Sequence, residues 1–216
     1  MFHGFGVRGA VEPRRLARPR QVHGNAVAHA GAGGRLEPME ADAVVSTQPA
    51  LAVGVVTADC VPILVSSLDG SAVAAIHAGW RGLAAGVVPT AITALRGRLA
   101  SGVRLVGAIG PHIGSCCYEV DEPVLDPLRS RFGTQLETQM WPTRPGHARL
   151  DLAGLVRFAL YEAGLDHTEQ GDLGAVCTQC DSDRFHSYRR DGRNAGRLVN
   201  FVAARGESNS SPDLEL

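Results

Sequence analysis

Short apolar runs rich in valine recur along the chain, and they constrain its fold more than any other feature. The predicted strands are residues 43–45, 51–56, 63–65, 73–76, 103–109, 174–177 and 198–202. Apolar residues at helical spacing occur instead over residues 83–99, 124–128 and 152–160, and Pro89 should kink the first of these helices or delay its start. Because strands and helices are mixed without strict alternation, we predict an α+β fold rather than a doubly wound parallel sheet.

The bulk properties fit one globular domain. The chain has 216 residues, of which 44% are hydrophobic and 20% charged, so we expect a single domain over residues 1–206 followed by a disordered polar tail, 207–216. Lys and Arg number 21 against 22 for Asp and Glu, which gives no electrostatic reason to expect nucleic acid or an anionic membrane as a partner.

No stretch approaches the roughly 20 apolar residues that cross a bilayer. The first residues also lack the pattern of a signal peptide, so we expect a cytoplasmic protein. In that compartment the five cysteines should be thiols or metal ligands rather than a disulfide framework.

Three short segments combine reactive side chains with neighbouring apolar runs. They are QVHG at residues 21–24, TADC at 57–60 and HAGWRG at 77–82. His23, Cys60 and His77 would supply two imidazoles and one thiolate, a set that suits zinc with an open fourth position for water, and copper could compete for it. Zinc would lower the pKa of that water to about 7.

The spacing of these residues is not that of a zinc finger or of one helical face, so other interpretations stay open. Cys60 could be a small buried hydrophobe, and His23 and His77 ordinary core residues. Cys60 could also be a thiolate nucleophile that His77 activates, as in Cys–His hydrolases.

The other cysteines give weaker signals. Cys177 and Cys180 form a CxxC pair, which is typical of half a zinc site or of a redox pair. No second CxxC exists, so we interpret these residues as structural thiols. Cys116 and Cys117 are adjacent, and one of the two thiols is a candidate for lining the pocket.

The order of motifs resembles that of the YfiH family, also called the laccase-domain or multicopper polyphenol oxidase-like family. The motifs are QVHG, ADAVVST, TADCVPIL, AAIHAGWRG, AIGPHIGSCCYEV and SYRRDGRNAGR, and they extend over roughly residues 21 to 203. The resemblance implies that His23, Cys60 and His77 bind zinc. It also implies an α/β/β/α layered sandwich with mixed sheets, a fold shared with a deamidating bacterial toxin.

The resemblance implies two kinds of activity. One is a zinc-dependent purine nucleoside enzyme that phosphorolyses adenosine, inosine, guanosine and methylthioadenosine and deaminates adenosine. The other is a Cys-dependent hydrolase or amidase that edits serine-containing peptidoglycan precursors. A non-catalytic metal-binding module and a single-copper polyphenol oxidase are further alternatives. Multicopper chemistry is disfavoured because the sequence shows no second or third cluster of copper ligands.

The nucleoside hypothesis assigns roles to further residues. Asp59 is a candidate acid–base carboxylate or a residue that orients the metal ligands. Arg81 suits phosphate because its guanidinium is a planar fork of donors, although a structural ion pair is the alternative. We also predict substrate contacts from Gln21 and from Arg189 or Arg190. The expected partners are a purine nucleoside and phosphate, with the protein a monomer or homodimer.

Overall fold

The computed structural model describes residues 2–165, 167–170 and 176–205. The tail 207–216 and residues 174–175 of the predicted strand 174–177 lie outside the described residues, and of its other two residues Cys177 makes a single isolated bridge with His112. Every other predicted strand forms within two residues of its predicted bounds.

The largest element is a mixed seven-stranded sheet in the order β13-β9-β7-β8-β5-β3-β4. Its strands are β3 (Val27–Ala30), β4 (Leu36–Glu37), β5 (Ala43–Ser46), β7 (Val61–Ser67), β8 (Val73–Ala78), β9 (Leu105–Ile109) and β13 (His167–Gln170). The pairs β3–β5 and β9–β13 are parallel, and the other pairs are antiparallel. The central strands β7 and β8 are buried along their whole length, which explains their continuous apolar sequence.

A four-stranded sheet in the order β1-β14-β6-β2 packs against one face of the larger sheet. Its strands are β1 (Phe2–Gly4), β2 (Leu16–Ala17), β6 (Ala52–Thr57) and β14 (Leu198–Ala203). Val53 and Val55 of β6 share a buried cluster with Val44 of β5 and Leu64 of β7. The two sheets therefore form a sandwich whose interior is made of small β-branched and aliphatic side chains.

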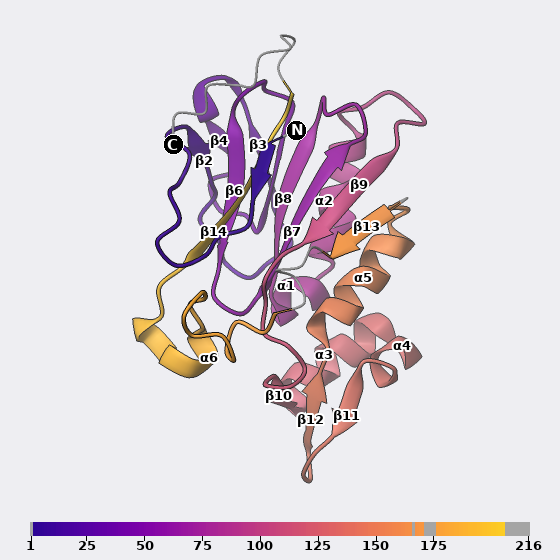
Figure 1. Ribbon diagram of the computed structural model, residues 1–216. Coiled ribbons are helices and arrows are strands. Elements are labelled where there is room, and N and C mark those ends of the chain that lie inside the picture. The colour runs from indigo at the N-terminus through magenta and orange to yellow at the C-terminus, as the bar shows by residue number, and fades with distance from the viewer. Residues whose placement is uncertain (1, 166, 171–175, 206–216) are drawn as a thin grey trace.

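Helices cover the opposite face of the seven-stranded sheet (Figure 1). They include α2 (Val87–Arg96), α3 (Glu122–Phe132) and α5 (Leu152–Glu162), which share the main core with Ile63 and Ile76. Pro89 delays the start of α2 rather than kinking it: the helix begins at Val87, after Gly86 at φ 85°, and Pro89 lies in the first turn, where no intrahelical N–H bond is required.

The remaining elements are short. A three-stranded sheet, in the order β10-β12-β11, lies beyond one end of the sandwich beside α3 and α4 (Figure 1). The elements are α1 (Trp80–Ala84), β10 (Glu119–Asp121), α4 (Thr134–Glu137), β11 (Met140–Pro142), β12 (His147–Leu150), α6 (Tyr188–Asp191) and the 3-10 turns Ala32–Gly34 and Gly192–Asn194.

The predicted α+β class with mixed sheets is confirmed. The second helical layer of the expected α/β/β/α sandwich, over the outer face of the smaller sheet, stays a prediction. None of the described helices has the length and apolar character to cross a bilayer.

Candidate metal centre

Cys60 lies in the link between the two sheets. β6 ends at Thr57 in the smaller sheet and β7 begins at Val61 in the larger one. The link turns sharply at Asp59, whose φ of 88° is unusual for a residue other than glycine. This turn places a partly exposed Cys60 thiol beside the end of β8.

His77 is held by a carboxylate that the sequence analysis did not single out. The side chain of His77 is buried on β8, and its Nδ1 lies 2.8 Å from Oδ1 of Asp42, a fully buried residue directly before β5. Asp42 also accepts the backbone N–H groups of Val22, His23 and Gly24 at 3.2, 2.9 and 2.7 Å. One carboxylate thus orients His77 and fixes the loop that carries His23.

The loop of His23 has a second anchor. The side-chain amide of Gln21 donates to the Val56 carbonyl at 2.8 Å and accepts the Val56 N–H at 2.7 Å. The backbone of His23 then takes a left-handed turn with φ 60°, and its ring meets His77 edge to face at 4.9 Å between centroids. Gln21, which we predicted as a substrate contact, has both the oxygen and the nitrogen of its side-chain amide bound to the backbone of Val56.

The three predicted ligands come together. The ligand atoms of His23, Cys60 and His77 all lie within 4.8 Å of one another, and donors on a tetrahedral zinc stand about 3.3–3.8 Å apart. A Cβ on Gly79 would lie 3.0 Å from Cys60 Sγ and 3.2 Å from His23 Cδ2, so only glycine leaves the space between the ligands open.

These residues fit a zinc ion. Because Asp42 occupies Nδ1 of His77, the other ring nitrogen is left to face Cys60, which is the carboxylate–histidine–metal arrangement of many zinc sites. Two imidazoles and one thiolate are also a donor set that zinc accepts readily.

Without a metal, the same residues form an ion pair. Burial opposes ionisation of the Cys60 thiol, but the imidazoles of His77 and His23 outweigh it and lower the pKa of Cys60 to about 6. Burial likewise disfavours the charged form of His77, yet the Cys60 thiolate and the Asp42 carboxylate raise the pKa of His77 to about 9. The metal-free site is therefore a thiolate beside an imidazolium that a carboxylate orients.

The carboxylate of Asp59 is occupied by hydrogen bonds from the protein. Its Oδ1 accepts the Thr178 hydroxyl at 2.6 Å, and its Oδ2 accepts the Ser187 hydroxyl at 3.0 Å and the Arg189 N–H at 2.6 Å. Its backbone carbonyl accepts the Ile113 N–H at 2.9 Å. Asp59 is 8% exposed, and its contacts hold two distant segments beside Cys60.

Tyr118 experiences the charges of Cys60 and of two arginines, Arg81 and Arg189. The guanidinium of Arg81 stacks on the Trp80 ring at 4.2 Å, and within the described part of the chain Arg81 has no carboxylate partner. Arg189 lies 5.2 Å from the Tyr118 ring and donates to the Glu119 carbonyl at 2.8 Å. Burial, and after it the negative charge of Cys60, raises the pKa of Tyr118, so this phenol shares the electrostatic environment of the site.

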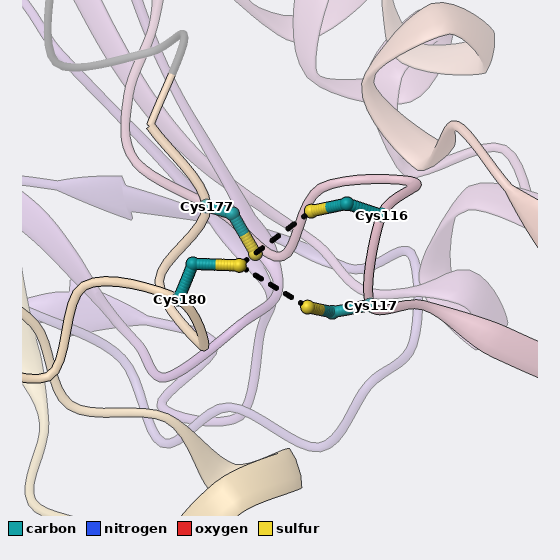
Figure 2. Close-up of side chains that lie close together, drawn as sticks. All are labelled: Cys116, Cys117, Cys177 and Cys180. Atoms are coloured by element: carbon teal, nitrogen blue, oxygen red, sulfur yellow. Dashed lines mark hydrogen bonds between the residues drawn. The ribbon is translucent and has the colours of Figure 1, made fainter.

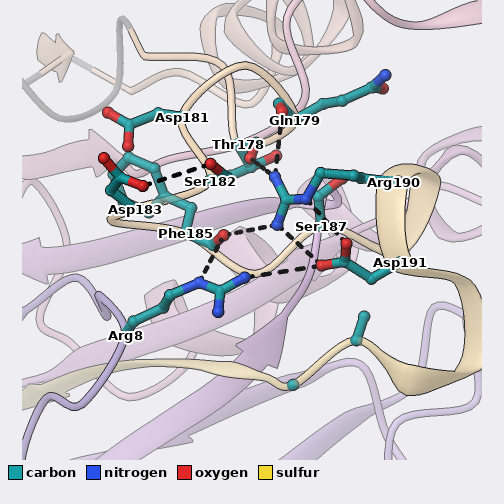
Figure 3. A network of polar contacts seen from close by, with 12 residues as sticks. Arg8, Thr178, Gln179, Asp181, Ser182, Asp183, Phe185, Ser187, Arg190 and Asp191 are labelled. Atoms are coloured by element: carbon teal, nitrogen blue, oxygen red, sulfur yellow. Dashed lines mark hydrogen bonds and ion pairs between the residues drawn. The ribbon is translucent and has the colours of Figure 1, made fainter.

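Arg190 has a different role from Arg189 (Figure 3). Its guanidinium makes hydrogen bonds to the carbonyls of Thr178, Gln179 and Phe185 and to both carboxylate oxygens of Asp191. These contacts hold the loop before α6 together and occupy the donors that a substrate would need.

Neither Asp42 nor the proximity of Tyr118 to the charge of Cys60 was predicted from the sequence. Asp42 had a detectable signal, because an acidic residue directly before an apolar strand must find partners when the strand is buried. Tyr118 had none, since its position depends on how the loop after β9 folds back towards Cys60.

Comparisons with known proteins show the family of the chain. The profile of the family described as "Multi-copper polyphenol oxidoreductase laccase" matches residues 7–205. A Streptomyces coelicolor protein named purine nucleoside phosphorylase is 39% identical over 194 residues, which are 89% of this chain and 76% of that protein.

Two solved structures share the fold. The Bacillus licheniformis protein YfiH, titled a hypothetical protein, aligns with a TM-score of 0.78 at 28% identity, over 88% of this chain and 74% of that one. YlmD from Geobacillus stearothermophilus aligns with a TM-score of 0.76 at 31% identity, over 89% of this chain and 74% of that one.

Proposed function

Because the chain belongs to the laccase-like family of YfiH and YlmD, we propose that it is a zinc-dependent purine nucleoside phosphorylase with its centre at His23, Cys60 and His77. The observation that carries the proposal is the convergence of these three ligands in a site with Arg81 and Arg189, whose guanidinium groups make no ion pair with a carboxylate in the described structure. The name of the Streptomyces coelicolor relative supports the choice of reaction.

His23, Cys60 and His77 would hold the zinc, and Asp42 would keep His77 in the tautomer that ligation needs. When bound, zinc supplies a Lewis acid at this position. Gly79 keeps the space between the ligands free of side-chain atoms.

Arg81 and Arg189 would bind phosphate, because a guanidinium matches the geometry of phosphate oxygens. In phosphorolysis a phosphate oxygen forms a bond to C1′ of the ribose, and the C1′–N9 bond breaks. The products are ribose 1-phosphate and the free purine base, which takes the proton. Arg189, whose guanidinium lies 5.2 Å from the Tyr118 ring, would orient the phosphate together with this phenol.

Adenosine deamination is a second activity that we assign to the same site. Water replaces the amino group at C6, which yields inosine and ammonia. Asp59 was our candidate for the proton transfer, but its carboxylate already accepts three hydrogen bonds from Thr178, Ser187 and Arg189. We therefore assign Asp59 a positioning role.

The metal-free ion pair favours a second candidate function. The Cys60 thiolate lies beside His77, and His77 is bound to Asp42, so the three residues could act as nucleophile, base and orienting carboxylate, as in a Cys–His–Asp hydrolase. Such an enzyme would edit serine-containing peptidoglycan precursors. Chelation should abolish the phosphorylase, whereas alkylation of Cys60 in metal-free protein should abolish the hydrolase.

The deciding experiment is product analysis on protein of measured zinc content. Adenosine, inosine, guanosine and methylthioadenosine are incubated with and without phosphate, using wild type and Cys60→Ala. We expect base release that requires phosphate, follows zinc content and disappears in Cys60→Ala. Base release that persists in metal-free protein would contradict the zinc dependence.

A variant pair tests the phosphate site. Arg81→Ala should raise the KM for phosphate about ten- to a hundredfold, because one charged hydrogen bond is lost. Arg35→Ala is the matched control, since Arg35 is exposed and pairs with Glu37 on the distant β4. An equal effect of the two substitutions on the KM for phosphate would contradict the assignment of Arg81 to the phosphate site.

The remaining alternatives predict other outcomes. A copper oxidase would contain copper and consume oxygen with polyphenols, and a binding module would contain metal without turning over any substrate.

A further inference from the structure

A second cluster of potential metal ligands lies outside the proposed active centre. It consists of the four cysteines Cys116, Cys117, Cys177 and Cys180, whose sulfur atoms all lie within 4.8 Å of one another. Figure 2 shows the four thiols pointing towards a common centre from two chain segments. We propose that these cysteines bind a structural zinc ion, which makes the protein a two-zinc enzyme.

The sulfur geometry fits a tetrahedral metal. With Zn–S bonds of about 2.3 Å, the sulfurs of a Cys₄ site stand about 3.8 Å apart. Cys180 Sγ lies 3.7 Å from Cys116 Sγ and 3.3 Å from Cys117 Sγ. All four thiols converge, whereas a disulfide would engage two and leave the other two unexplained.

The backbone around Cys177 is arranged for a thiolate. The Gly114 N–H donates to Cys177 Sγ at 3.2 Å, and Cys180 N–H donates to the Cys177 carbonyl at 3.1 Å, so the CxxC segment forms a tight turn. Cys116 and Cys117 complete the set from a second turn, in which the Cys117 N–H donates to the Gly114 carbonyl at 3.0 Å. The second pair of ligands is thus a CC pair, which a search for a second CxxC overlooks.

Two arginines hold the turns of such a site, and one of them, Arg190, is itself paired with Asp191. Four thiolates around Zn²⁺ carry a net charge of −2, after four thiol protons have been released. Arg149 donates to the Cys116 carbonyl at 2.6 Å, and Arg190 donates to the Thr178 and Gln179 carbonyls at 3.1 Å. Both guanidinium groups are therefore bound to the two turns that carry the sulfurs.

The position of the cluster explains what the zinc would do. One turn continues from Ile113, whose N–H binds the Asp59 carbonyl, and the other contains Thr178, whose hydroxyl binds the Asp59 carboxylate. A zinc ion at the cysteines would fasten these two segments together on either side of the residue that precedes Cys60. The zinc at the cysteines does not depend on which reaction the active centre catalyses, whereas the total of two zinc ions rests on the zinc proposed at His23, Cys60 and His77.

The test is zinc analysis together with X-ray absorption at the zinc edge. Protein is stripped and reloaded with Zn²⁺ as the only metal, for wild type and for His23→Ala, which removes an exposed ligand of the other site and leaves all the cysteines in place. We expect two zinc ions per chain in wild type and one in His23→Ala. The remaining ion should have a shell of four sulfurs at about 2.3 Å.

A substitution in the cysteine cluster provides the complementary experiment. Cys180→Ala should also retain one zinc per chain, with a mixed nitrogen and sulfur shell. If Cys180→Ala does not fold, the zinc content of His23→Ala still shows whether the four cysteines bind zinc, because that variant keeps all of them. Zinc-free His23→Ala would overturn the proposal, whether its thiols react freely or a mass loss of two hydrogens reveals a disulfide.

Discussion

Asp42 provides the sharpest test of how the active centre is built. Burial alone would raise the pKa of Asp42, but hydrogen bonds from His77 and from the Gly24 N–H hold that pKa below its usual value. The carboxylate is therefore ionised at neutral pH. Its Oδ1 accepts hydrogen bonds from His77 Nδ1 and the His23 N–H, and its Oδ2 accepts them from the Val22 and Gly24 N–H groups.

Asp42→Asn keeps the shape of the side chain but replaces one acceptor oxygen with an NH₂ group. Whichever way the amide is turned, two of the four donors lose their acceptor and face another donor. With charge-assisted bonds of about 1.5–3 kcal/mol each, we expect the free energy of unfolding to fall by about 3 kcal/mol. Zinc affinity should fall about 10- to 100-fold, as for other carboxylates that orient a ligating histidine.

Competition with chelators of graded strength measures the zinc affinity, and urea denaturation measures the stability. The zinc ion that belongs to this centre is identified by its absence from His23→Ala. Asp69→Asn is the matched control, because Asp69 also accepts hydrogen bonds, from Ser67 and Ser71, but lies in the exposed turn between β7 and β8. Wild-type zinc affinity in Asp42→Asn would refute the claim that this carboxylate orients His77.

Three further outcomes follow from the same geometry. Gly79→Ala should lower zinc affinity at least about tenfold, because its Cβ would lie 3.0 Å from Cys60 Sγ, while Gly97→Ala, whose Cβ would approach nothing closer than 3.5 Å, should not change it. In metal-free protein, peptide mapping should show that iodoacetamide alkylates Cys60 with a midpoint near pH 6, since the thiolate exists above that pH, and the midpoint should move upward in His77→Ala. Arg190→Ala should lower the free energy of unfolding by about 3 kcal/mol in a urea titration, because hydrogen bonds to three carbonyls and one carboxylate are lost, and a change below about 0.5 kcal/mol would contradict that role.

The sandwich was predictable because its central strands are buried on both faces. A strand such as β7 must be apolar at every position, so it is visible in the sequence as a continuous run. The small sheet formed by β10, β11 and β12 was missed because its strands are short and mostly half-exposed or exposed. The helix predicted over residues 83–99 divides into α1 and α2 at Gly86, where φ is 85°, a break that apolar spacing does not reveal.

The active centre was only partly predictable, for a different reason. His23, Cys60 and His77 were identified as ligands through a family resemblance, because their spacing matches no metal motif. Their proximity depends on a link that crosses from one sheet to the other, and the role of Asp42 depends on a loop that folds back onto β5. Contacts between segments far apart in the chain leave no local pattern, and the cysteine cluster was overlooked for the same reason.

The strained link at Asp59 connects the two clusters of ligands. A non-glycine residue at φ 88° costs on the order of 1–3 kcal/mol, and it persists only where surrounding contacts hold it. Those contacts come from Ile113, Thr178, Ser187 and the Arg189 N–H, on the two segments that the four cysteines bring together. These contacts to Asp59 therefore fix the backbone that positions Cys60, and a zinc ion at the four cysteines would make the two segments that provide them rigid. Substitutions that weaken these contacts should lower metal affinity at His23, Cys60 and His77 without any change to those ligands.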